Sequence, residues 1–197
     1  MKGTVTEDFQ GILVHDHKIT FYRCGSAHQE CLAHVERYLK DSMENESSLT
    51  WNRRMRELLQ RMIHYRKEHT GEASLDAQTV AGFETEYQEI LDKAKEEYKR
   101  NEPSPYYREG YNLYRRMQEY KTEHLLFLHD MRVPTTNNTA ERCLRDYKRK
   151  QTFAMTFRSL ESIEELCHSK GVLLEVRKNN PNIYTAVMEI FNRRYGA

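Results

Sequence analysis

The chain has 197 residues, a formal net charge of +1, and 38% hydrophobic and 11% aromatic residues. This length and composition exclude a mini-protein and a disordered chain, and they predict one folded domain or a domain with an insertion. No run of about eighteen apolar residues is present and none follows Met1, which excludes a transmembrane helix and a signal peptide. A soluble, cytoplasmic protein with reduced cysteines is therefore expected.

Strand character is confined to the beginning of the chain. The apolar run Phe9–Val14 ends in His15, Asp16 and His17, which predicts a buried strand with polar side chains at its C-terminal end. A second, weaker strand is expected over Ile19–Tyr22, with a helix beginning at about Gln29. Sites in α/β proteins lie at such strand ends.

Beyond Asp41 the pattern is almost entirely helical. Apolar residues at spacings of three and four predict one helix around Met55–Ile63 and a second around Val80–Tyr98, expected to be antiparallel neighbours. Two prolines in residues 101–105 break the pattern, and a third helix is expected over Tyr106–Leu128.

The last third of the chain follows a loop that contains Pro134. A helix is predicted to start at or just after Asn138, and Gly171 and Asn180-Pro181 are expected to divide the remainder into two last helices. The fold class expected is thus α/β, with most residues in helices.

Two acidic residues have both a structural and a catalytic interpretation. Asp16 follows a buried strand, so its carboxylate could bind Mg²⁺ on rigid backbone or could cap a turn. Glu141 lies three residues after Asn138, a spacing typical of a capping box, and a helix N-terminus also presents an acid to a metal or phosphate site. These interpretations do not exclude one another.

Positive charge gathers after Glu141. Six basic residues stand against Asp146 alone: Arg142, Arg145, Lys148, Arg149, Lys150 and Arg158. Because a solvated helix face usually carries both signs, this excess predicts contact with the phosphate backbone of DNA or RNA. Most of the thirteen tyrosines are expected to pack helices, with base stacking by a few left open.

Four residues suggest zinc at first sight: Cys24, His28, Cys31 and His34. Structural zinc sites use two short ligand pairs separated by a dozen or so residues, and this spacing does not match. If His28, Cys31 and His34 share a helix, the outer two diverge by much of a turn. The sequence therefore argues against zinc and predicts a buried Cys31 and a polar His34 near a site.

Several segments together resemble the transposases of the insertion-sequence-66 group. In chain order they are Phe9–Asp16, Cys31–Arg37, Pro134–Arg145, Arg149-Lys150 and Phe157–Ser159. The most specific is the Asn-Asn-x-Ala-Glu-Arg-x-x-Arg element at residues 137–145. The resemblance runs over essentially the whole chain and is loosest between residues 45 and 130.

This resemblance implies a ribonuclease H-like fold with a helical insertion. Residues 1–44 would form a partial core, 45–130 the insertion, and 131–197 helices that carry a catalytic Glu and a basic DNA-contact zone. In DDE-type chemistry three acids hold two Mg²⁺ ions, with Mn²⁺ an alternative, for in-line displacement at phosphorus. Asp16 would be the second acid and Glu141 the third.

The resemblance also implies supporting and DNA-binding residues. Cys31, His34, Arg37, Asn137 and Asn138 would support the site, and Arg142, Arg145, Arg149, Lys150 and Arg158 would contact DNA. The partners would be insertion-sequence ends and a full-length transposase or a missing N-terminal half, with no membrane. The location would be the bacterial cytoplasm, at the nucleoid when the chain is bound to DNA.

One departure from the family pattern shapes the functional hypothesis. The family's first Asp lies on the first strand, with further strands before the second Asp, and only fifteen residues precede Asp16. The leading hypothesis is a transposase fragment that lacks the first acid and is inactive alone. The alternatives are a non-catalytic DNA-binding or transposase-interacting module, and a product that folds poorly because its sheet edge is exposed.

Overall fold

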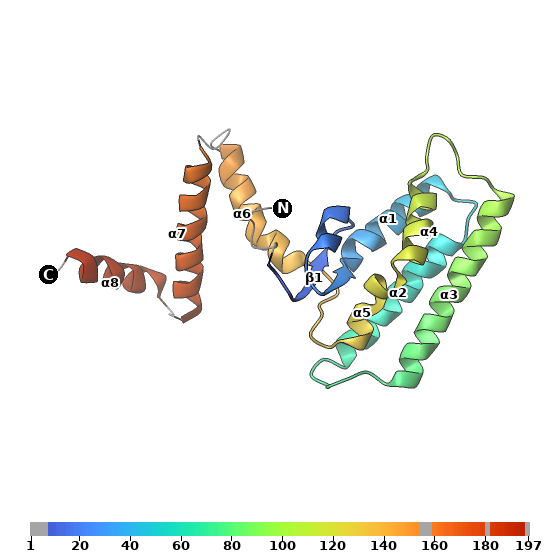
Figure 1. Cartoon of the computed structure of the whole chain (residues 1–197), viewed down its shortest axis with the longest axis horizontal. Coiled ribbons are helices and arrows are strands. Elements are labelled where there is room, and N and C mark those ends of the chain that lie inside the picture. The colour runs from blue at the N-terminus through green and yellow to red at the C-terminus, as the bar shows by residue number, and fades with distance from the viewer. Residues whose placement is uncertain (1–7, 154–158, 180–181, 196–197) are drawn as a thin grey trace. The chain divides into compact units, whose positions relative to one another are not determined.

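The structure is a computed structural model that describes residues 8–153, 159–179 and 182–195. The chain divides into two compact units, Met1–Ala140 and Glu141–Ala197, and each is treated by itself (Figure 1). Helices predominate in the described residues, beside a small two-stranded parallel sheet. The expected α/β class with a large helical content is confirmed.

The sheet consists of β1 (Ile12–His15) and β2 (Ala27–Glu30), paired in parallel with Ile12 opposite Ala27 and His15 opposite Glu30. The first strand lies where it was expected. The strand predicted over Ile19–Tyr22 is wrong, because Ile19–Arg23 forms the 3₁₀ helix η1. The actual second strand escaped detection because its sequence, Ala-His-Gln-Glu, buries polar rather than apolar side chains.

Five α-helices complete the first unit: α1 (Leu32–Asn45), α2 (Trp51–Glu68), α3 (Ala77–Arg100), α4 (Glu109–Glu119) and α5 (Lys121–His129). Helices α2 and α3 lie side by side and antiparallel, as predicted (Figure 1). Their apolar stripes close a continuous core around the fully buried rings of Trp51, Tyr87 and Phe127. This burial is the main source of helix stability in such bundles.

The single helix expected over Tyr106–Leu128 is instead divided into α4 and α5. Tyr120 separates them, with φ −111° and ψ 37°, outside the helical region. The Gln29 side chain fixes α5 to the sheet, since its Nε2 donates to the His124 carbonyl at 3.3 Å and its Oε1 accepts from the Phe127 N–H at 2.8 Å. The division between α4 and α5 is thus accompanied by a buried contact from β2, which the local sequence does not reveal.

The second unit contains most of α6 (Asn138–Phe153), together with α7 (Leu160–Asn179) and α8 (Ile183–Tyr195). The helix start at Asn138 and the two last helices are confirmed. Gly171 does not divide them, because it lies inside α7, with open space around its Cα where a side chain would be. Among the described residues, no helix is both long and apolar enough to cross a membrane.

Candidate active site

Three segments far apart in the sequence meet at Cys31. The Cys31 N–H donates to the His15 carbonyl at 2.8 Å, which joins the start of α1 to the end of β1. The Cys31 Sγ accepts a 3.5 Å hydrogen bond from the backbone N–H of Asn137, 106 residues away, and the Leu32 N–H donates to the Thr135 carbonyl at 2.9 Å. Cys31 is 1% exposed, so its prediction as a buried apolar residue is confirmed.

Asp16 lies at this meeting point, directly after β1. Its backbone carbonyl accepts from the Lys18 N–H at 2.7 Å and from the His15 ring, which closes a tight turn. The side chain is half-buried. The turn and the position at the strand end occur together, so the structure accommodates both interpretations of this residue.

His34 and Arg37 follow Cys31 at intervals of three along α1. Residues at this spacing lie near one another on a helix surface. His34 is half-buried and Arg37 is exposed. The Cys-x-x-His-x-x-Arg segment therefore runs from the buried meeting point at Cys31 outward to solvent.

The segment before α6 is held against Cys31 through Asn137. The Asn137 Oδ1 is buried and accepts no hydrogen bond from the residues that the structure describes. Asn138 begins α6, and Glu141 lies in the first turn of that helix, where the helix dipole favours an acid. Because Glu141 begins the second unit, the structure groups Asp16, Cys31, His34, Arg37, Asn137 and Asn138 in the first unit and Glu141 in the second.

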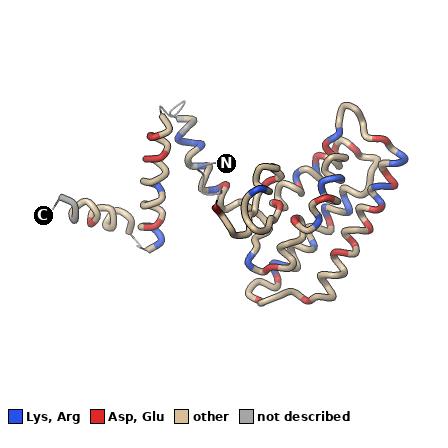
Figure 2. The backbone as a smooth tube through the Cα atoms, in the orientation of Figure 1, with Lys and Arg blue, Asp and Glu red and all other residues tan. Residues whose placement is uncertain are grey.

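The predicted basic residues lie along α6. Arg142, Arg145, Lys148, Arg149 and Lys150 are all exposed, and Figure 2 shows the positive charge on this helix. Arg142, Arg145 and Arg149, at spacings of three and four, share one face. Arg158 lies outside the described residues.

Sequence reasoning missed the buried acid of this region, Glu30, which is 1% exposed at the end of β2. Its Oε1 accepts a hydrogen bond from Tyr22 at 2.6 Å and lies 2.5 Å from His17 Nδ1. Its Oε2 lies 3.2 Å from His124 Nε2 and 3.5 Å from Arg116 Nε. Basic residues thirteen positions away in one case and more than eighty in the others thus surround one carboxylate, a grouping without a local sequence signal.

These neighbours determine the ionisation of Glu30. Burial by itself would raise its pKa, but hydrogen bonds from His124 and His17 and the charges of His124 and Arg116 outweigh burial and hold the pKa far below its usual range. Burial and the bond to Glu30 raise the pKa of Tyr22. Glu30 is therefore an anion already paired within the protein, which suits a structural link between the sheet and α4 and α5 rather than a metal ligand.

With this geometry established, comparison with known proteins identifies the family. The sequence matches the Transposase IS66 family over residues 2–165. The chain belongs to the IS66 transposase family. No curated protein and no solved structure matches the chain.

The Cys31 segment and the Asn137 segment, which both carry the resemblance to this family, adjoin in space. Transposases act on DNA, and the family match includes Asp16, Glu141 and the described basic residues of α6. The match ends at residue 165, within α7, so most of the second unit's last two helices lie beyond it.

DDE-type transposases generally use divalent metal ions, which are held by a group of acidic or similar side chains. Carboxylate oxygens are suitable ligands for Mg²⁺. However, among the described residues no group of three or more His, Cys, Asp or Glu side chains is placed to hold a metal ion. Asp16 belongs to the first unit and Glu141 to the second.

The cysteine and histidine set is distributed over different elements. His28 lies on β2, so it does not share a helix with His34. The Nδ1 atom of its ring is 3.2 Å from His15 Nε2. Burial, and then the neighbouring His15, lower the pKa of His28. Two of the four cysteines, Cys24 and Cys31, are buried, and the other two, Cys143 and Cys167, are exposed.

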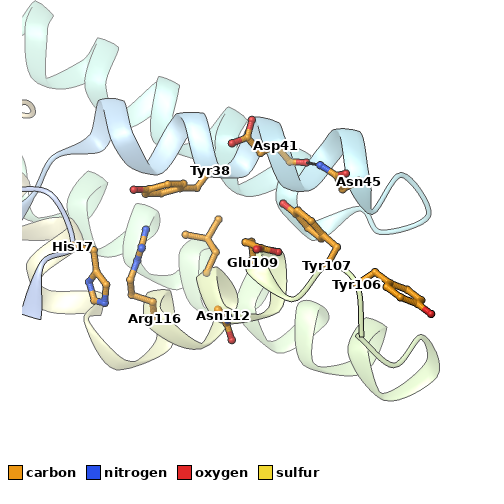
Figure 3. Close-up of a pocket in the computed structure, with 10 residues that line it drawn as sticks. His17, Tyr38, Asp41, Asn45, Tyr106, Tyr107, Glu109, Asn112 and Arg116 are labelled. Atoms are coloured by element: carbon orange, nitrogen blue, oxygen red, sulfur yellow. Dashed lines mark hydrogen bonds between the residues drawn. The ribbon is translucent and has the colours of Figure 1, made fainter. Parts of the chain in front are cut away.

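A groove of about 580 Å³ extends from His17 along α1 and α4 (Figure 3). At the end near His17, the Arg116 guanidinium lies 4.8 Å from the centre of the Tyr38 ring, which faces it from α1. Asp41 and Glu109 line the same groove farther along. This mixture of charges does not match a polyanion, so the groove is not assigned to DNA.

Proposed function

We propose that this chain acts in DNA transposition, in the cutting and strand transfer of insertion-sequence ends. The family match over residues 2–165 carries this proposal. It is supported by the contact between the two family segments at Cys31 and Asn137. The proposed fold is ribonuclease H-like, with residues 1–44 in the core, 45–130 as the helical insertion and 131–197 as the C-terminal helices.

Asp16 and Glu141 are the proposed catalytic acids, the second and third of a DDE set. An Mg²⁺ ion held by them would supply positive charge at the phosphate where it is attacked. In this proposal the first acid comes from outside the described residues. We therefore expect the chain on its own to be catalytically inactive.

The supporting residues have roles that follow from their contacts. Cys31 fixes the segment before α6 through its hydrogen bond from Asn137. His34, Arg37 and Asn138 extend from this contact toward the proposed site. Arg142, Arg145, Arg149 and Lys150 would hold DNA phosphates beside the reacting bond, with Arg158 continuing this zone in the sequence.

A second candidate function is a non-catalytic module that binds DNA or a transposase in the bacterial cytoplasm and nucleoid. The observation that favours it is the row of exposed basic residues along α6. Such a module would need the basic face of α6 but neither acid.

DNA affinity with and without Mg²⁺ separates the two candidates. We expect Mg²⁺ to strengthen binding of the full chain to an insertion-sequence end, and Asp16→Asn or Glu141→Gln to abolish that gain. Glu161→Gln is the matched control, since Glu161 occupies the first turn of α7. Binding that ignores Mg²⁺ and Glu141 but is lost in Arg145→Gln plus Arg149→Gln would favour the non-catalytic module, and absence of DNA binding would overturn both.

Nicking of supercoiled DNA tests the incomplete site. The purified chain should produce no nicks with Mg²⁺ or Mn²⁺, because the loss of one ligand removes several kcal/mol of transition-state stabilisation, roughly a thousandfold or more in rate. Robust nicking that Asp16→Ala abolishes would show that the chain supplies all the acids itself.

A further inference from the structure

A pocket on the opposite side of α4 from the Figure 3 groove has a different charge pattern. It has a volume of about 370 Å³ and lies between α3, the loop before α4, and α4. Four of its lining residues are basic, namely Lys95, Lys99, Arg108 and Arg115, and none is acidic. Helices α3 and α4 are in contact, and Figure 2 shows charges of both signs along α3.

Three of these cations are available to a ligand. Lys95, Arg108 and Arg115 are exposed and form no salt bridge with any residue that the structure describes. Lys99 is paired with Glu96 at 2.7 Å, and Asp92 lies close enough to help raise the pKa of Tyr114, after burial and Tyr111. Glu46 is a third acid near the pocket, since its Oε2 accepts a hydrogen bond from the Tyr98 hydroxyl at 3.1 Å. Three acids near four basic residues leave the pocket with an excess of positive charge.

The floor of the pocket is aromatic and rigid. The rings of Tyr98, Tyr111 and Tyr114 lie 5.0 to 5.9 Å apart between centres, and Trp51 packs behind Tyr98 and Tyr114 at 6.2 and 6.1 Å. Tyr98 and Tyr114 are buried. A cleft lined by charge of one sign over a wall of low polarity concentrates the electric field and attracts ions of the opposite sign.

The four cations stand in two rows. Lys95 and Lys99 are one turn apart on α3, and Arg108 and Arg115 are seven residues apart at the start and along the face of α4. Both spacings place the pair on one helix face. Two rows of exposed cations across a narrow pocket suit a chain of phosphates, since the backbone of DNA presents one negative charge about every 1.7 Å along its axis.

From this arrangement we propose that the pocket between α3 and α4 binds the phosphate backbone of DNA, as a contact separate from the basic face of α6. This inference rests on the proposed function, because it assumes that the chain binds DNA. It adds a nucleic-acid contact in the helical bundle, at residues outside the segments that carry the resemblance to the family. Its role is to hold DNA in addition to the contact that α6 makes.

The salt dependence of binding measures how many phosphates each surface neutralises. The full chain is titrated against a fluorescently labelled DNA duplex at a series of NaCl concentrations, and compared with Lys95→Gln plus Arg115→Gln. The slope of log affinity against log salt is negative, and the loss of two contacts to B-DNA should make it shallower by about 1.8. The matched control is Lys67→Gln plus Lys93→Gln, two exposed cations of α2 and α3 outside the pocket, which should leave the slope unchanged.

The α6 variant separates this inference from the proposed function. Suppose that Arg145→Gln plus Arg149→Gln makes the salt-dependence slope shallower, while Lys95→Gln plus Arg115→Gln leaves it unchanged. The pocket inference is then wrong and the proposed function stands. An equal change of the slope in the control variant Lys67→Gln plus Lys93→Gln also overturns the inference. The change would then come from the lower net charge of the chain and not from the pocket. If the unmodified chain binds no DNA, both are overturned.

Photo-cross-linking locates the contact directly. DNA carrying a photoreactive group should cross-link to peptides from residues 93–118 as well as to peptides from α6, and the pocket variant should lose only the first set. Cross-links confined to α6 would contradict the proposal. Circular dichroism of each variant checks that exposed Lys-to-Gln and Arg-to-Gln changes leave the fold intact, with effects on unfolding free energy within about 0.5 kcal/mol.

Discussion

The two units bury their apolar side chains very differently. In the first unit, α1 to α5 close a core in which residues from every helix are buried. In the second unit Ala186 is the buried apolar residue among those described, and many large ones are exposed: Leu144, Leu160, Val172, Leu173, Leu174, Tyr184, Met188, Ile190 and Phe191. Helices gain most of their stability from packing, so the first unit should be far more resistant to unfolding than the second.

Removal of the buried acid Glu30 should lower the stability of the first unit strongly. Glu30→Ala would leave His124 and Arg116 without their carboxylate, and loss of one partner from a buried charge network costs about 3–5 kcal/mol. Urea unfolding of the purified chain measures this loss. Glu97→Ala serves as a control acid, because Glu97 is only half-buried and caps backbone groups at Thr50 and Trp51. A loss below about 1 kcal/mol for Glu30→Ala would contradict the structural role.

The low pKa of Glu30 predicts that the unfolding free energy depends on pH. Because the folded pKa of Glu30 is below its ordinary value of 4.5, the folded state binds fewer protons than the unfolded state. The resulting stability is fully present above about pH 4.5 and is lost as the pH falls below it. Unfolding free energies measured from pH 6 downward should therefore decline in the native chain. Glu30→Gln should show a shallower decline, and an identical decline in both would contradict the pKa direction.

A matched pair of leucines compares the two units directly. Leu59 is fully buried in α2, whereas Leu173 in α7 is 41% exposed. Leu59→Ala should lower the unfolding free energy by about 2–5 kcal/mol, because it leaves a cavity in a closed core. Leu173→Ala should change it by no more than about 0.5 kcal/mol. Comparable losses would indicate that α7 is buried in solution.

A pair of glycines should respond with opposite signs. A methyl group at Gly110 in α4 would collide with the Glu46 carboxylate, which is held by Ser42 at 2.8 Å and Tyr98 at 3.1 Å. Gly110→Ala should therefore cost about 1–3 kcal/mol. At Gly171 nothing lies within 4 Å, so Gly171→Ala should stabilise α7 by about 1 kcal/mol through helix propensity. Thermal unfolding followed by circular dichroism measures both, and destabilisation by Gly171→Ala would reveal a close neighbour of α7.

Prediction from the sequence succeeded where buried residues follow a regular apolar spacing. The apolar spacing of Met55–Ile63 and Val80–Tyr98 gave two antiparallel helices, and the run before His15 gave the first strand. It failed at β2, whose buried residues are polar, and at Tyr120, where the helix stops although the apolar pattern continues. Hydrogen bonds between distant residues join β2 to α5, and a periodic pattern of apolar residues cannot reveal them.

The candidate site divides in the same way. The linear motifs placed Asp16 after a strand, Cys31 in a buried position and Glu141 in the first turn of a helix. The contact between Cys31 and Asn137 spans 106 residues, and the network around Glu30 draws on α4 and α5. The pocket between α3 and α4 also requires two helices to be side by side before its cations form a group.

By itself, the sequence determined the class of fold, most of the helices, the membership in a transposase family and the basic character of α6. Those properties follow from composition and from local order along the chain. Only the tertiary structure decided that Glu30 is a buried, ion-paired acid, that Cys31 joins three segments, and that positive charge surrounds a tyrosine floor. Side chains far apart in sequence create each of these features, because burial and charge act through space.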